Sequence, residues 1–178
     1  MGILVFLLFS AQVIDRVAVV VGNNVITETE VLQEARLEAF LNQTALDLGA
    51  EARKAAADRL VNQQLVRNEM TVGAYPDPTD AEVEGALKSF RQEHFNSIPA
   101  YRASLEKYGI TEDQLKKHLT WQVAAIHFTD QRFSPATNGD QSANREAPGS
   151  STDDQFDAWL KQARSQTKIQ FKQGAFQQ

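Results

Sequence analysis

The stretch VIDRVAVVVGNNVITETEVLQEARLEAF, residues 13–40, decides how the rest of the chain is arranged. Its β-branched residues stand on either side of Gly22-Asn23-Asn24, a triplet that tolerates the positive φ of a hairpin turn. Thr27 can then cap a helix, and Glu30, three residues later, completes a capping box. The stretch therefore predicts a strand, a tight turn, a short second strand and a helix. It supplies structure and no chemistry of its own.

Helices are predicted to fill most of the chain that follows this hairpin. Apolar residues recur at three- and four-residue spacing after Thr27, and this first helix is expected to end near Leu48-Gly49. A second helix is expected over residues 51–72, and a further long helix over residues 112–132. The intervening helix starts are marked by Thr79 with Glu82, by Pro99 in a first turn, and by Thr111 with Gln114, and Gly109 marks a helix end.

The C-terminal part of the chain is predicted to return to the first strand. Residues 134–151 are rich in Pro, Gly, Ser and Asn and are expected to form a flexible linker. Thr152 with Gln155 then predicts a last helix, and residues 167–171 alternate polar and apolar side chains as a half-buried strand does. A lone strand needs a partner, and the other strand candidates lie before residue 27. We therefore expect a mainly α fold of about six helices, with a small sheet that pairs the N-terminal and C-terminal strands.

The chain opens on an apolar run, GILVFLLFSA, at residues 2–11. This run is too short to cross ~30 Å of hydrocarbon as a helix, and its length suits the apolar region of a secretory signal. A buried first strand or a non-native extension is the alternative, and no Lys or Arg precedes the run. Residues 1–12 are therefore interpreted as a partial signal peptide, which would place the protein in the periplasm.

Composition bounds the function classes that the chain can serve. Its 178 residues suffice for one domain with a real core. A net charge of -5 without any block of Lys or Arg argues against binding of nucleic acid, because nothing would neutralise a phosphate backbone. The chain has no cysteine, which removes disulfides, thiolate zinc sites and thiol nucleophiles.

A search for chemistry finds no constellation that indicates an enzyme. The histidines His94, His118 and His127 lack the spacing of a metal site, and no serine stands in a nucleophile elbow. We therefore expect no catalytic, cofactor-binding or metal-binding residues. Aromatic-rich helices can line an apolar groove for extended polypeptide, although most such residues serve as core. The candidates for client binding are Phe90, Phe95, Tyr101, Tyr108, Trp121 and Phe128.

Four segments of the chain carry a family resemblance. They are residues 13–31, the run RLVNQQL at residues 59–65, the run YGITEDQL at residues 108–115, and FDAWL at residues 156–160 with Lys168-Ile169. In this order and spacing the chain resembles the SurA family of periplasmic chaperones and peptidyl-prolyl isomerases. The resemblance implies the helical chaperone core found in the SurA N-terminal region and in the C-terminal region of trigger factor.

The resemblance also implies a function and a missing domain. In that family the N-terminal helices and the C-terminal helix form one core that binds unfolded outer-membrane proteins without ATP, and parvulin-type isomerase domains are inserted between them. Here the insertion point falls at residues 134–151, which is far too short for a domain of about a hundred residues. The expected protein is thus a chaperone core built from residues 13–133 and 152–178, without isomerase activity.

Two alternatives stay open at this point. One is an isomerase-related enzyme with a cryptic site in the helical core. The other is a structural module in which the last helix and strand exchange between two copies, because swapping costs little when the same contacts are remade.

Overall fold

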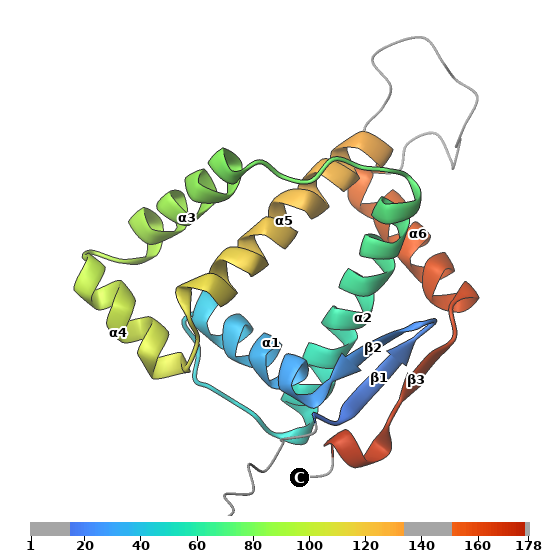
Figure 1. Ribbon diagram of the computed structural model, residues 1–178, viewed down its shortest axis with the longest axis horizontal. Helices are drawn as coiled ribbons and strands as arrows, with labels where there is room; N and C mark the ends of the chain where they lie inside the picture. Colours follow the sequence, from blue (N-terminus) through green and yellow to red (C-terminus); the bar gives the residue numbers. More distant parts are fainter. Residues whose placement is uncertain (1–14, 134–150, 177–178) are drawn as a thin grey trace, which may run out of the picture.

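The computed structural model describes residues 15–133 and 151–176, and these residues are mainly helical with one small sheet (Figure 1). The helices are α1 (Glu28–Leu41), α2 (Ala50–Val72), α3 (Asp80–His94), α4 (Ile98–Tyr108), α5 (Glu112–Phe133), α6 (Thr152–Gln166) and a 3-10 turn, η1 (Gln173–Phe176). The strands are β1 (Val17–Val21), β2 (Asn24–Thr27) and β3 (Ile169–Phe171). The predicted mainly α fold with a small sheet is confirmed. The expected signal peptide, residues 1–12, and residues 134–150 of the expected linker lie outside the described residues.

The sheet joins the two ends of the described chain. Its strand order is β2-β1-β3, with both neighbours antiparallel to β1. Gly22 begins the turn between β1 and β2 at φ 58°, and it is the member of the predicted turn triplet that needs the positive φ. Val21 faces Ile169 across the β1–β3 pair. The pairing of the N-terminal strand with residues 167–171 is therefore confirmed.

The capping residues predicted from the sequence begin three of the helices. Thr27 with Glu30 and Thr79 with Glu82 form reciprocal capping boxes at α1 and α3. At α5 the Thr111 N–H donates to Gln114 Oε1 at 2.8 Å, and the Gln114 N–H donates to Thr111 Oγ1 at 3.2 Å. These ends were predictable because each cap depends on neighbours only three residues apart.

The first helix is shorter than its apolar periodicity predicts. It ends at Leu41, whereas the sequence indicated an end near Leu48-Gly49. The Asn42 side chain donates to the Glu38 carbonyl at 3.1 Å and so takes an acceptor of the last helical turn. Gln43 then turns the backbone away at φ 51°, which no α-helix can accommodate.

The start of the last helix also differs, by one residue. Its N-cap is Ser151, whose Oγ accepts from the Asp154 N–H at 3.1 Å, while Asp154 Oδ2 accepts from the Ser151 N–H at 3.0 Å. The predicted pair of Thr152 with Gln155 is therefore wrong. Aspartate at the third position reaches back to the cap and also places a negative charge at the positive end of the helix dipole.

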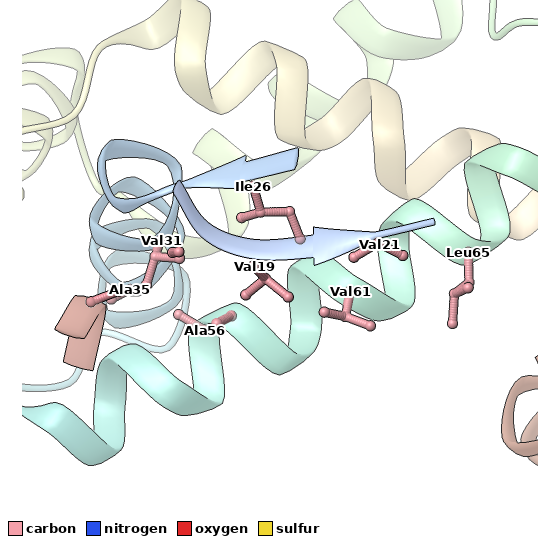
Figure 2. Close-up of a cluster of buried hydrophobic side chains, with 11 residues drawn as sticks. Val19, Val21, Ile26, Val31, Ala35, Ala56, Val61 and Leu65 are labelled. Carbon is pink, nitrogen blue, oxygen red and sulfur yellow. The ribbon is translucent and has the colours of Figure 1, made fainter. Parts of the chain in front are cut away.

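Three clusters of buried side chains hold the elements together. The first lies between the sheet, α1 and α2, and Figure 2 shows Val19, Val21 and Ile26 of the sheet beside Val61 of α2. The second joins α1, α3, α4 and the start of α5 around Phe40. The third joins the C-terminal halves of α2 and α5, and Phe156 and Trp159 of α6 pack against it.

The helices α1, α2 and α5 surround the centre of the molecule, with α3 and α4 on one side and the sheet with α6 on the other (Figure 1). Within the described parts of the chain, every helix is too short or too polar to cross a membrane.

Candidate functional site

A cavity of about 830 Å³ lies between α1, α2 and α5, and we call it the central cavity. Its walls come from α1, α2 and α5, from β2, and from the connection that follows α2 (Figure 1). This volume lies within the range of roughly 300–1,000 Å³ that is typical of pockets for drug-sized ligands. Because all three helices contribute to it, the cavity depends on the packing of the whole core and not on one local motif.

The lining of the central cavity mixes polar and apolar side chains. Four glutamines face it: Gln33 from α1, Gln63 and Gln64 from α2, and Gln114 from α5. Each glutamine amide carries two donors and an acceptor, the same kinds of group that a peptide backbone presents. Apolar side chains, among them Leu60 of α2, line the cavity beside these glutamines.

Glu34 is the most buried charged residue of the cavity wall, with an exposed fraction of 5%. Its Oε1 accepts from Arg59 Nε at 3.3 Å and from Gln63 Nε2 at 3.4 Å. The partners come from α2, so the carboxylate ties α1 to α2 beside the cavity. A buried carboxylate is stable only with such partners.

His118 faces the same cavity from α5. Its Nε2 atom is buried and lacks a hydrogen-bond partner among the described residues. Burial lowers the pKa of His118 below its ordinary value; the carboxylates of Glu34 and Glu38 oppose this, and the guanidinium groups of Arg59 and Arg67 reinforce it. The imidazole is consequently neutral at neutral pH. It can offer one donor or one acceptor to a bound molecule, depending on the tautomer.

Arg67 and Lys117 supply positive charge at the cavity. The Arg67 guanidinium lies 5.2 Å from the centre of the Trp121 ring, a cation–π contact that joins α2 to α5. In the described part of the chain, neither Arg67 nor Lys117 has a carboxylate within ion-pair distance. The two cations are therefore available to an acidic group that enters the cavity.

The structure places the six aromatic candidates in different environments. Trp121 lines the central cavity. Tyr101, Tyr108 and Phe128 are exposed by 2% or less, so they serve as core and have no surface with which to touch a client in this conformation. Phe90 and Phe95 are partly buried and pack against Phe40, with ring centres 5.5 and 5.8 Å away. The structure does not bring the six side chains together into one groove.

Sequence reasoning missed most of the residues that line the cavity. The glutamines, Arg67 and Lys117 stand on the polar faces of amphipathic helices, where a solvated surface is the ordinary interpretation. The run of Gln63 and Gln64 was visible in the sequence, but nothing local shows that this face meets α1 and α5. No group of three or more His, Cys, Asp or Glu residues in the described ranges could hold a metal ion.

The chain matches no protein-family model and no curated protein sequence.

Proposed function

We propose that the protein is an ATP-independent, chaperone-like module of the periplasm that binds unfolded polypeptide in its central cavity. Outer-membrane proteins that have not yet assembled are the proposed clients. The proposal includes no isomerase activity, since the chain has only residues 134–151 where the resembled family carries its parvulin domain.

The observation that carries this proposal is a cavity lined by amide side chains. An unfolded segment has a donor and an acceptor at almost every residue, and each group loses water when the segment enters a cavity. Gln33, Gln64 and Gln114 can replace that water on any sequence, because they pair with backbone and not with particular side chains. Trp121, which stands on α5 like Gln114, adds an apolar surface to the cavity. Such a lining supports binding of many different clients.

The test is suppression of aggregation of a denatured outer-membrane protein at a near-stoichiometric ratio. We expect the wild-type protein to suppress aggregation. Gln33→Trp fills the cavity from α1 and should weaken client binding at least about tenfold, which corresponds to a loss of about 1.4 kcal/mol of binding free energy. Its suppression of aggregation should fall accordingly. Gln162→Trp is the matched control, because Gln162 is exposed on α6 away from the cavity. Equal suppression by both variants would place client binding elsewhere, and no suppression by the wild type would refute the function.

The exchanged dimer remains a second candidate, favoured by the weak burial of α6. None of the α6 residues is buried, and its polar contacts with α2 are those of Arg164 with Asp58, at 2.9 Å, and with Asn62. Sedimentation at micromolar concentrations decides between the two, since a client-binding monomer gives a single 19.8 kDa species. The isomerase alternative is tested by measuring cis/trans exchange in a proline peptide. We expect only uncatalysed exchange, which takes tens of seconds or longer.

A further inference from the structure

The free edge of β2 borders the central cavity. β2 is an edge strand because the sheet order is β2-β1-β3, and it lies on the inner side of the sheet, toward the opening between the helices (Figure 1). Val25 and Ile26 contribute to the cavity wall, and 54% of Val25 is exposed. An edge strand presents backbone groups that no neighbouring strand satisfies.

Two backbone hydrogen bonds fix which way the backbone groups of β1 point. The Gly22 N–H donates to the Lys168 carbonyl at 2.9 Å, and the Lys172 N–H donates to the Ala18 carbonyl at 2.8 Å. Backbone groups alternate in direction along a strand, so Val20, midway between Ala18 and Gly22, also directs its N–H and C=O toward β3. The residues on either side of Val20 point the other way, toward β2.

The direction of the groups on β2 follows from this alternation. Val25 stands opposite Val20 in the β1–β2 pair, so its N–H and C=O point away from β1 and toward the cavity. At the next outward position the Thr27 N–H is already used, because it donates to Glu30 Oε2 at 2.7 Å in the capping box. Val25 thus presents one backbone donor, its N–H, and one backbone acceptor, its C=O, to the cavity.

A backbone donor and acceptor side by side on an edge strand match another extended backbone. The strand also lies close to a positive charge: Asn24 Nδ2 donates to Asn68 Oδ1 at 3.3 Å, which holds the turn end of β2 against α2 next to Arg67. Arg67 has no carboxylate partner in the described structure, as shown above, and Lys117 lines the cavity from the opposite helix α5. The cavity lining also contains carboxylates, of which Glu30 accepts from Thr27 and Glu34 accepts from Arg59 and Gln63. Beside β2, Arg67 is therefore the charge that an acidic side chain of a bound segment would complement.

We infer that an extended segment of client polypeptide pairs with β2 at Val25 as an added strand within the central cavity, and that it carries an acidic side chain which meets Arg67. The inference rests on the proposed function and specifies how the client is held. A flexible segment can reach this edge, whereas a second folded copy would have to bring its own sheet between α1 and α5. The glutamines of the walls then satisfy the backbone groups of the segment that β2 cannot reach.

Substitution at Val25 tests the backbone pairing directly. Val25→Pro removes the outward N–H and takes no hydrogen bond from the β1–β2 ladder, and proline is tolerated on an edge strand in this orientation. Val25→Ala also removes the branched side chain but keeps the N–H, so it is the control for the loss of the valine. By fluorescence anisotropy with a labelled ten-residue peptide of Thr, Val and one central Asp, we expect Val25→Pro to bind at least about threefold more weakly than Val25→Ala.

Two changes in the peptide test the same contact without altering the protein. N-methylation of alternate residues blocks one edge of an extended peptide, so methylation in the register that faces β2 should weaken binding to the wild-type protein more than methylation in the other register, which faces the adaptable glutamine side chains. Replacing the central Asp by Lys should weaken binding to the wild type but not to Arg67→Gln. If Val25→Pro fails to fold by circular dichroism, the two methylated peptides decide the question.

The outcomes separate this inference from the proposed function. Equal binding by folded Val25→Pro and Val25→Ala, or equal binding of both methylated peptides, overturns the added strand while aggregation suppression by the wild type still supports the chaperone. Equal affinity for the Asp and Lys peptides overturns the acidic preference. A change in sedimentation of Val25→Pro without a change in peptide binding assigns the edge to a second copy and overturns the inference. A wild type that neither binds peptide nor suppresses aggregation removes both proposals.

Discussion

His118 is a single residue whose protonation is set by its surroundings in the central cavity. Burial is the largest influence on its pKa, and it favours the neutral imidazole. The charged groups around it belong to three helices: Glu34 and Glu38 on α1, Arg59 and Arg67 on α2, and Lys117 on its own helix α5. Because its pKa is lowered in the folded protein, His118 links the stability of the fold to pH.

The sign of this link can be worked out. In the unfolded chain His118 binds a proton below its ordinary pKa of 6.5, whereas in the folded chain it does so only at lower pH. The unfolded state is therefore favoured as the pH falls below 6.5, with a slope of at most about 1.4 kcal/mol per pH unit for one proton. When the pH is lowered from 7.5 to 5, we expect the free energy of unfolding to decrease less in His118→Gln than in the wild type.

Urea titrations at several pH values measure this difference. Thr120→Ser, a conservative change on the same wall that introduces no titrating group, should keep the pH dependence of the wild type. Parallel losses in His118→Gln and the wild type would show that the histidine does not contribute to the pH dependence.

At the residue scale, the sequence predicts what depends on near neighbours. Gly22 and Thr27 were identified because a turn and a cap are local chemistry. The outward N–H of Val25 was not identified, since its direction depends on the register with β1 and β3. The burial of Glu34 was missed for the same reason: its partner Arg59 lies 25 residues away on another helix.

At the scale of elements, the start of α6 provides a sharp test of the corrected cap. Ser151 accepts from the Asp154 N–H and thereby satisfies one of the free donors of the first turn, whereas Thr152 is already inside the helix. We expect Ser151→Ala to lower the free energy of unfolding by about 0.5–2 kcal/mol. Thr152→Ala should change it by less than about 0.5 kcal/mol, as is usual for an exposed or half-exposed surface position.

Thermal unfolding monitored by circular dichroism compares the two variants on the same helix. The reverse order, with Thr152→Ala the more destabilised, would restore the cap predicted from the sequence. The sequence could not separate the two, because Ser151 with Asp154 and Thr152 with Gln155 have the same spacing of three residues.

For the molecule as a whole, the sequence predicted the order of helices and the meeting of the two ends, but not the central cavity. Helix order follows from periodicity and caps, and the β1–β3 pairing follows from the need of a lone strand for a partner. The cavity depends on the angles at which α1, α2 and α5 pack, and no local pattern specifies them. Trp121 shows the limit, because the aromatic pattern alone could not distinguish it from the buried Phe128.

The closed arrangement makes the N-terminal elements dependent on the C-terminal ones. β3 covers one edge of β1, while Leu160, Ala163 and Phe171 pack against the first cluster, in which Val19 and Val21 are fully buried. Deleting residues 152–178 exposes that cluster to water. At roughly 1.5–3 kcal/mol for each large apolar side chain uncovered, we expect the shortened chain to lose about 5 kcal/mol or more.

Two measurements follow the effect of this deletion across the whole molecule. The melting temperature should fall sharply, and hydrogen exchange should become faster at β1 and α1 as well as in α2, since these three elements share the first cluster. Adding residues 152–178 as a separate peptide should restore protection, because β3 can then pair with β1 again. An unchanged melting temperature after deletion would mean that the N-terminal elements are stable by themselves. The proposed dependence of β1 and α1 on the C-terminal elements would then be refuted.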